Sequence, residues 1–341
     1  SFHKRSDARR ERNASSLVPK TCPETTSSLR SSSAVDQHEH SLVLSSSSGI
    51  AMRTLLFAQP TAADWQKRAR TELGETPELR QRRLDEFRSI ASQIREFRPR
   101  LDDDFLLRFL RAKKFNLHRA VKTYKRYFRI RLLDPERFMP VGKGPRDYAD
   151  AFKLEVGTLL ERLNPLDGTT TVIWRFGKWT PSCGLDLRDI FTPTAMVGDL
   201  TLEDPQVQVN GVRFVLDVES LRYAYIRYLP FSAIRALIMA LQDGYPVRFK
   251  GFHVVHNTSL WDMLYGAARP MLGQKQHSRF HLHGSDFDSL HRFIPAEILP
   301  FEYGGTAGHF SSTWITTKLF EKHDQFVRDS YYGYDVPPRQ K

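Results

Sequence analysis

The sequence predicts a protein of the α/β class, in which a helical unit packs on a mostly parallel β-sheet. Three observations lead to this prediction. The chain of 341 residues is 40% hydrophobic, which is enough to bury one large core and a smaller helical one. Residues 64–134 place apolar side chains three and four positions apart, the period of amphipathic helices. Beyond them, short β-branched and aromatic runs alternate with helix-length segments, as in parallel sheets with helical crossovers.

Residues 61–134 are expected to form an N-terminal helical domain. Thr76 and Pro77 are a good N-cap and first helical residue. A run of aspartates opens the helical segment 102–115, where the helix dipole favours negative charge, and Asn116 caps the next helix. The expected buried stripes are Phe105, Leu106, Phe109 and Leu110 on the first of these helices, and Leu117, Ala120, Val121, Tyr124, Tyr127 and Phe128 on the second.

Residues 135–325 are expected to form the sheet domain. The strand candidates are 169–176, 212–218, 247–256 and 279–284. Helical patterns separate them at 231–244, which ends on a glycine, and at 259–272.

The two ends of the chain are predicted to lie outside these domains. Fourteen serines occur in the first 48 residues, so we expect residues 1–60 to be a disordered leader or tail. Met52 is the first methionine, and the hypothesis is that residues 1–51 are translated leader, with a phospho-acceptor tail as the alternative. Residues 326–341 are predicted to be a C-terminal tail.

Positive charge is concentrated in one part of the chain. The net charge is +12, and the segment from Arg80 to Arg131 holds 17 Lys and Arg against 6 Asp and Glu. This distribution favours an oriented basic surface, although solvated Lys and Arg faces are also common on ordinary helices.

Cysteine use and hydropathy indicate an intracellular protein. Cys22 and Cys183 lie too far apart to suggest a disulfide framework or a zinc site, which suits a reducing compartment. No apolar run approaches the roughly 18 residues of a transmembrane helix, and no convincing signal peptide is present. We therefore expect a soluble, cytoplasmic protein.

The sequence contains no motif that indicates catalysis. Neither phosphate-binding loops nor nucleophile, zinc or paired-cysteine motifs occur. His281 and His283 share one face of a predicted strand, but a third metal ligand at suitable spacing is missing. His253 and His256 point to opposite faces. The prediction is a protein that is not an enzyme, with no catalytic residue, no metal and no cofactor.

The strand at 245–256 raises a question about charge. Its period places Tyr245, Val247 and Phe249 on one face and Arg248 and Lys250 on the other. Burying two unpaired cations would cost several kcal/mol or more. Either acidic residues from elsewhere neutralise them, or this end of the strand reaches the surface and meets an anionic partner.

Residues 259–272 raise a second question. They are apolar around most of a helix and are followed by Lys275 and Arg279. Such a helix is usually buried core, but an apolar helix beside a basic turn would also suit a lid that touches membranes. Periodicity leaves both interpretations open.

Several motifs together resemble the CRAL-TRIO family of lipid-binding proteins, in its tocopherol- and retinaldehyde-binding branch. "DDDFLLRFLRAKKF" is similar to the N-terminal helical signature, and "FVLDVES", "LQDGYPVRFKGFHVVHN", "RFHLHGSD" and "ILPFEYGG" to successive blocks of the lipid-binding domain. The likeness spans about residues 64–325. It implies a helical domain packed on an α/β domain, a deep apolar pocket floored by the sheet, and a mobile gate at about 256–279. It also implies one bound hydrophobic molecule and no covalent chemistry.

The resemblance implies two sets of site residues. The cavity positions fall on Val212, Leu216, Tyr223, Leu229, Leu237, Ala240, Leu241, Tyr245, Val247 and Phe249, with Trp261, Leu264, Ala267, Ala268 and Leu272 from the gate. The phosphoinositide-binding positions fall on Lys113, Lys122, Arg248, Lys250, Lys275 and Arg279. Two positions depart from the pattern: His277 replaces an accessory cation, and Arg227 stands where the tocopherol branch has a large apolar pocket residue.

These implications lead to a functional prediction. We expect a monomeric carrier of a tocopherol- or retinoid-like lipid, with phosphatidylinositol bisphosphate as docking partner. It would act in the cytoplasm and associate peripherally with endosomal or other anionic membranes. Alternatives are a phosphatidylinositol or phospholipid exchanger, a phosphoinositide sensor and, more remotely, a nucleic-acid-binding protein; Tyr124, Tyr127 and Phe128 have core spacing, which argues against nucleic acid as a partner.

Overall fold

The architecture was obtained as a computed structural model, in which residues 53–341 form one compact unit. The residues that it describes are 56–57, 62–133, 139–186, 188–219, 221–228, 239, 244–272 and 274–335. Among these residues, no helix combines the length and the apolar character needed to cross a membrane.

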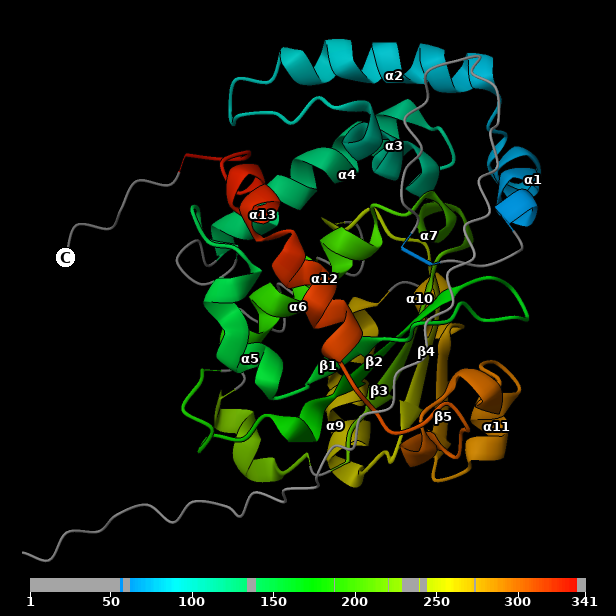
Figure 1. Ribbon diagram of the computed structural model, residues 1–341, viewed down its shortest axis with the longest axis vertical. Helices are drawn as coiled ribbons and strands as arrows, with labels where there is room; N and C mark the ends of the chain where they lie inside the picture. Colours follow the sequence, from blue (N-terminus) through cyan, green and yellow to red (C-terminus); the bar gives the residue numbers. More distant parts are fainter. Residues whose placement is uncertain are drawn as a thin grey trace, which may run out of the picture. The chain divides into compact units, whose positions relative to one another are not determined.

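Four helices form the N-terminal layer, as the helical periodicity predicts (Figure 1). The cap residues act as expected: the Thr76 side chain accepts a hydrogen bond from the Leu79 N–H, and Asn116 accepts one from the Arg119 N–H. Asp102 caps the third helix in the same way. The bounds are α1 Ala62–Leu73, α2 Pro77–Ser92, α3 Asp103–Ala112 and α4 Leu117–Ile130.

Aromatic rings form the core of this layer. Phe105 and Phe109 from α3 make edge contacts with Tyr124 from α4 at centroid distances of 6.1 and 5.3 Å. Phe87 from α2 contacts Tyr124 at 5.4 Å. The stripe predicted on α3 is confirmed as buried, because Phe105 and its stripe neighbours expose at most 2% of their surface.

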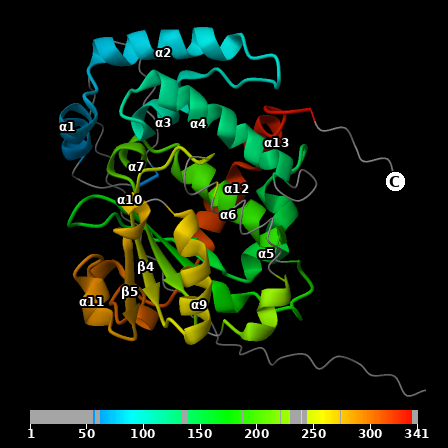
Figure 2. The ribbon, with the colours of Figure 1, turned by 180° about the vertical axis from the view of Figure 1, so that it is seen from behind.

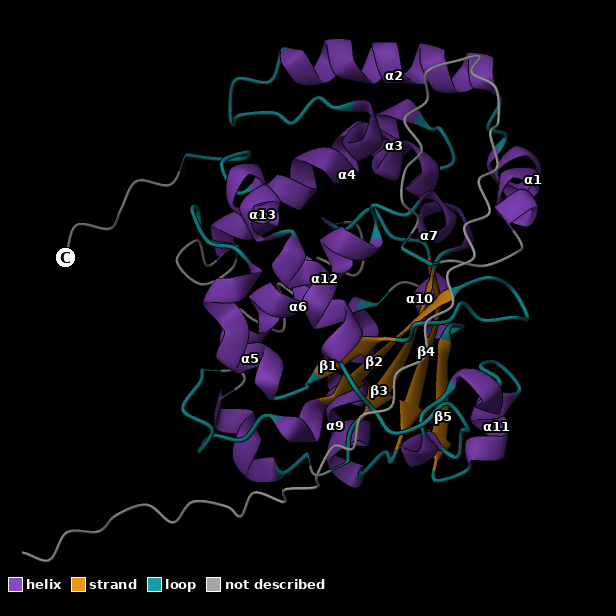
Figure 3. Ribbon diagram, viewed as in Figure 1, coloured by secondary structure: helices purple, strands orange, loops and turns teal. Residues whose placement is uncertain are grey.

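The sheet has five strands in the order β1-β2-β3-β4-β5, in which only β1 runs antiparallel to its neighbour (Figure 3). All four predicted strands are present. The additional strand, β1, is only three residues long and carries no period that could be recognised. The bounds are β1 Gly157–Leu159, β2 Thr170–Arg175, β3 Val212–Asp217, β4 Phe249–Val255 and β5 Phe280–Gly284.

Each face of the sheet is covered by a different apolar group. Ile173, Val215 and Val255 pack on one face against residues that follow β5, including Leu290 on α11. The opposite face, called here the cavity face, carries Trp174 and Phe214. The remaining described helices are α5 Ala149–Lys153, α6 Arg188–Thr201, α7 Pro205–Asn210, α9 Ser259–Ala268, α10 Gln274–His277, α11 Phe287–His291, α12 Thr313–Glu321 and α13 His323–Asp329.

Parts of both predicted terminal segments belong to the folded unit. Phe57 is 1% exposed and packs edge-on against Trp314, and its N–H donates to Asp204. Phe326 is buried, and Arg98 exchanges backbone hydrogen bonds with Gly333. The expectation of a leader at 56–57 and of a tail at 326–335 is therefore wrong, because buried aromatic residues attach these stretches to the core. The other residues of 1–60, Met52 included, lie outside the described part.

Candidate functional site

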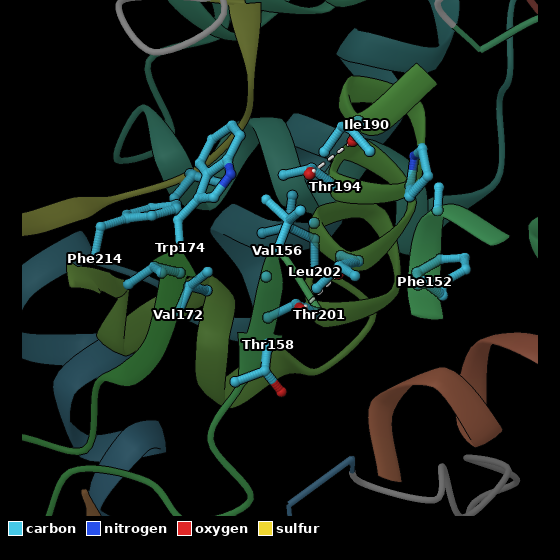
Figure 4. Close-up of a pocket in the computed structure, with 17 residues that line it drawn as sticks. Phe152, Val156, Thr158, Val172, Trp174, Ile190, Thr194, Thr201, Leu202 and Phe214 are labelled. Carbon is cyan, nitrogen blue, oxygen red and sulfur yellow. Dashed lines mark hydrogen bonds between the residues drawn. The ribbon is translucent and has the colours of Figure 1, made fainter. Parts of the chain in front are cut away.

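An apolar cavity of about 80 Å³ lies on the cavity face of the sheet, between β2, β3, α5 and α6 (Figure 4). Phe152 comes from α5, Val172 and Trp174 from β2, and Thr194 from α6. The full lining is Ala151, Phe152, Val156, Gly157, Thr158, Val172, Trp174, Ile190, Pro193, Thr194, Val197, Gly198, Thr201, Leu202, Val212, Phe214 and Val247.

The hydroxyl groups of this lining are already engaged by the protein. Thr194 donates to the Ile190 carbonyl at 2.9 Å, and Thr201 donates to the Val197 carbonyl at 2.6 Å. Thr158 donates to the carbonyl of Ser311 at 2.9 Å. Because these donors are satisfied internally, the wall offers hydrocarbon contact rather than hydrogen bonds.

Aromatic rings extend the apolar surface away from the cavity. Phe176 stacks on the cavity residue Trp174 at 5.2 Å and lies 6.3 Å from Trp261 of α9. Phe252 stacks on Phe214 at 5.6 Å. We call this group the aromatic cluster; its rings are Trp174, Phe176, Phe214, Phe249, Phe252, Trp261 and Phe280.

The structure brings several predicted cavity residues to this region. Val212 and Val247 line the cavity itself. Leu216, Phe249 and Trp261 belong to the packed group around the aromatic cluster. These predicted residues therefore lie on the cavity face of the sheet, while the role of each side chain in ligand binding stays a prediction.

Other predicted cavity residues lie elsewhere. Tyr245 packs edge-on against Tyr127 of α4, at 5.4 Å, in the helical core. Tyr223 is 58% exposed and its hydroxyl lies 3.4 Å from Ser259 Oγ. Ala267 is exposed on α9, and the remaining gate positions Leu264, Ala268 and Leu272 are half-buried. The side chains of Leu229, Leu237, Ala240, Leu241 and the divergent Arg227 lie outside the described part.

Sequence reasoning missed all of the lining contributed by α5 and α6. Val197, Gly198 and Thr201 follow Pro193 in a helix that was not predicted. The apolar spacing of "FTPTAMVGDLT" could have predicted this helix. The internal proline argued against it, because proline usually ends a helix.

Arg248 and Lys250 contact an acidic residue from the helical layer. Glu72 of α1 accepts a hydrogen bond from Arg248 at 2.8 Å and lies 3.9 Å from the Lys250 ammonium. Arg248 also donates to the Val209 carbonyl and keeps only 12% of its side chain exposed. An acidic residue from elsewhere in the chain thus neutralises these cations, which is the first alternative of the sequence analysis, while their role in phosphoinositide binding stays a prediction.

The pKa values of Glu72, Lys250 and Arg279 are all shifted by the charge or hydrogen bonding of Arg248. The hydrogen bond from Arg248 is the main cause that lowers the pKa of Glu72, so the carboxylate stays ionised. Burial, with the nearby Arg248 charge, lowers the pKa of Lys250. The same two causes lower the pKa of Arg279, which places Arg279 in the field of Arg248.

The other predicted basic positions are more dispersed. Lys113 is half-buried at the C-cap of α3, and Lys122 is exposed on α4. The Lys275 side chain is outside the described part. Arg68 was missed: its charge acts on both Glu72 and Lys250, and its spacing of four residues from Glu72 was the available signal.

Histidines form a hydrogen-bonded group on the sheet face opposite the cavity. His253 Nδ1 lies 3.0 Å from His283 Nε2, and His283 Nδ1 lies 2.6 Å from Ser289 Oγ. His281 stacks on His253 at 5.0 Å. The predicted shared face of His281 and His283 is thus correct, and His253 and His283 hydrogen-bond to protein groups. His256, near Asp217 and Glu219, hydrogen-bonds to Asp217 at 3.0 Å.

Comparison with known proteins identifies the family. Residues 166–305 match the CRAL/TRIO domain, and residues 83–125 match the CRAL/TRIO N-terminal domain. The human "Alpha-tocopherol transfer protein-like" is 33% identical over 264 residues, which cover 77% of this chain and 76% of that protein. The chain belongs to the CRAL/TRIO family.

One further relative and one solved structure are similar to this CRAL/TRIO protein. Human Clavesin-2 is 32% identical over 280 residues, covering 80% of this chain and 84% of the relative. A crystal structure of Sfh5 aligns with a TM-score of 0.45 at 12% identity, covering 80% of this chain and 100% of that one.

The family matches leave part of the cavity outside their bounds. The CRAL/TRIO segment contains β2 to β5 and α9, together with the cavity residues of α6. Phe152 and Val156 precede it. The cavity of this CRAL/TRIO protein is therefore built partly from the segment between the two matched regions.

Proposed function

We propose that this CRAL/TRIO protein binds one hydrophobic lipid on its cavity face and carries it between membranes. The supporting observation is the apolar cavity, whose wall hydroxyls are engaged by backbone carbonyls and whose surface continues into the aromatic cluster. A tocopherol- or retinoid-like molecule suits such a wall. The name of the tocopherol-transfer-like relative supports the same class of cargo.

The free energy of burying the lipid should be similar in the protein and in a bilayer, so that the carrier can both take up and release its cargo. Burying ~400 Å² of lipid surface yields roughly 10 kcal/mol relative to water, and a membrane offers a similar gain. Ligand sites usually enclose about 300–1,000 Å³, more than the cavity of about 80 Å³. Loading therefore requires the site to open, and we assign this movement to the gate at about 256–279, which packs on the aromatic cluster through Trp261.

Docking on phosphoinositides is the second part of the proposal. Arg248, Lys250 and Arg279 form its centre, with Lys113, Lys122 and Lys275 as further candidates. Each cation near an anionic surface contributes about 1 kcal/mol, so a few suffice for weak, reversible binding. The proposed place of action is the cytoplasmic face of endosomal or other anionic membranes.

A cavity-filling substitution tests the lipid site. Val197→Phe adds a ring to the cavity wall, so we expect the amount of lipid bound per protein to fall at least tenfold, because the ring occupies the ligand volume. Bound lipid is measured by extraction of the purified protein and mass spectrometry, which also identifies the cargo. A phospholipid as the main cargo would support the exchanger instead.

The control is the same valine-to-phenylalanine substitution at an exposed position outside the cavity lining. Val141 is 52% exposed, so Val141→Phe should leave lipid loading unchanged. Full loading of a folded Val197→Phe variant would contradict the assigned site.

A further inference from the structure

The indole N–H of Trp261 is a buried hydrogen-bond donor. Trp261 lies on α9, beside β4 and β5 in Figure 2, and packs in the aromatic cluster. Its indole Nε1 is inaccessible to solvent and has no hydrogen-bond partner in the part of the chain that the structure describes. Buried indole N–H groups usually find an acceptor, because leaving a donor dry and unpaired costs free energy.

The indole N–H groups of two other tryptophans donate hydrogen bonds to backbone carbonyls. Trp179 Nε1 donates to the Leu185 carbonyl at 3.0 Å, and Trp314 Nε1 donates to the Leu159 carbonyl at 2.7 Å. Trp261 differs from both, although its own backbone N–H is capped by the Thr258 side chain at 3.4 Å. The unpaired group is thus the indole alone, on the side chain that turns into the aromatic cluster.

The surroundings of Trp261 limit which acceptors could pair with its indole N–H. The side chains of its cluster are rings and hydrocarbon, and Phe176 connects it to the cavity residue Trp174. The phenyl and indole rings of the cluster carry no oxygen that could accept from the indole N–H. A charged acceptor would need a cation beside it, because burying an unpaired carboxylate is costly.

We infer that the indole N–H of Trp261 is the polar anchor of the lipid site and selects cargo that carries an uncharged oxygen acceptor. This inference rests on the proposed lipid-binding function and specifies its ligand class. The hydrocarbon part of the cargo occupies the cavity beyond Trp174. Its alcohol, aldehyde or ester oxygen accepts from Trp261 beneath α9. A plain hydrocarbon of equal length leaves the donor unpaired and binds more weakly.

A matched ligand pair tests the assignment on the full-length protein. Retinaldehyde and axerophtene share one polyene and differ by the aldehyde oxygen. Wild-type protein should bind the aldehyde about tenfold more tightly, because only the aldehyde pairs the buried donor. Trp261→Phe keeps an aromatic ring and removes the N–H, so it should abolish this preference by weakening aldehyde binding alone. Trp179→Phe removes a paired N–H and should leave the preference intact.

Spectroscopy supplies a readout that does not depend on a stable variant. In wild-type protein labelled with ¹⁵N, the Trp261 indole resonance should move downfield with retinaldehyde and stay in place with axerophtene. Equal affinities for the two ligands, or an indole resonance unmoved by bound aldehyde, would overturn the anchor while leaving the lipid function standing. Failure of the wild type to bind either ligand would overturn both.

Discussion

At the residue scale, Glu72 controls the charge of the proposed docking surface. One carboxylate lies within 4 Å of both Arg248 and Lys250, and its side chain is 40% exposed. In the proposed docking mode, a lipid phosphate that binds Arg248 must displace Glu72, so the carboxylate would compete with the phosphoinositide.

Substitutions of opposite sign test this competition. Glu72→Gln should bind vesicles containing phosphatidylinositol bisphosphate about fivefold more tightly, because one charge near an anionic surface contributes about 1 kcal/mol. Arg248→Ala with Lys250→Ala should bind about thirtyfold more weakly and lose phosphoinositide-dependent transfer, with lipid affinity nearly intact. Vesicle co-sedimentation and transfer assays measure these effects.

The control for net charge is Glu86→Gln, which removes an acid of α2 that pairs with Arg83. It should leave vesicle binding nearly unchanged. If Glu72→Gln weakened vesicle binding, Glu72 would position the cations rather than compete for them. An equal loss of vesicle binding and lipid affinity in the double variant would contradict the division between the two faces.

At the element scale, β4 connects the cavity face with the histidine group behind it. A bulge at Lys250 pairs Val212 with Phe249 but Arg213 with Gly251. The bulge shifts the alternation by one residue, so Phe249 and Phe252 lie on one face, 5.5 Å apart, and His253 lies on the other. A side chain at position 251 would collide with His253, which explains the glycine.

The contacts of His253 define its protonation. Arg213 Nη1 lies 3.4 Å from His253 Nε2, and an arginine can only donate, so Nε2 must accept and Nδ1 carries the proton donated to His283. Burial, with the neighbouring His281, His283 and Arg213, lowers the pKa of His253 to about 2. Burial likewise lowers the pKa values of His281 and His283.

Acid sensitivity follows from this arrangement. The folded-state pKa of His253 is below its unfolded value near 6.5, so the unfolded chain binds the proton first and stability falls as the pH drops below about 6.5. Between pH 7 and pH 5, His253 alone should remove about 2 kcal/mol from the free energy of unfolding. His253→Asn keeps a donor near Nδ1 and cannot titrate. Between pH 7 and pH 5, its free energy of unfolding should therefore fall by about 2 kcal/mol less than that of the wild type, as measured by urea unfolding at both pH values. Identical pH dependence in both proteins would show that His253 does not carry the effect.

At the scale of the whole molecule, a buried polar junction attaches the helical layer to the sheet layer. Arg111 of α3 binds Glu75 through two hydrogen bonds of 2.7 and 2.9 Å. Its third contact is Gln208 of α7, at 2.8 Å. Glu75 and Arg111 expose only 2% and 5% of their side chains. The Arg111–Gln208 contact joins this buried pair of the helical layer to the rest of the unit.

Breaking the junction should destabilise the whole unit. Glu75→Gln leaves the buried Arg111 charge without its counter-ion, and the expected loss in the free energy of unfolding is about 3 kcal/mol. Asp150→Asn disrupts an exposed pair with Lys153 and should cost less than about 1 kcal/mol. Thermal or urea unfolding followed by circular dichroism compares the two. A separate early transition of the helical layer in Glu75→Gln would show that the layers unfold independently.

The sequence by itself determined the four helices of the N-terminal layer, α9 and four of the five strands. Helix caps at Thr76 and Asn116, and the strands around Val215 and Val254, were predictable because capping and alternation are local properties of the chain. The motifs also identified the family, and the apolar character of the site followed from the face that carries Val247.

Only the tertiary structure decided which side chains meet. Glu72 and Arg248 are separated by 176 positions, and no local pattern indicates that a helix of the first layer neutralises a cation that directly precedes β4. The bulge at Lys250 redirected the strand faces, and the unpaired state of Trp261 depends on every neighbour around its indole. Periodicity reports the face on which a residue lies, whereas pairing of charges and hydrogen bonds depends on three-dimensional contacts between segments that are distant in sequence.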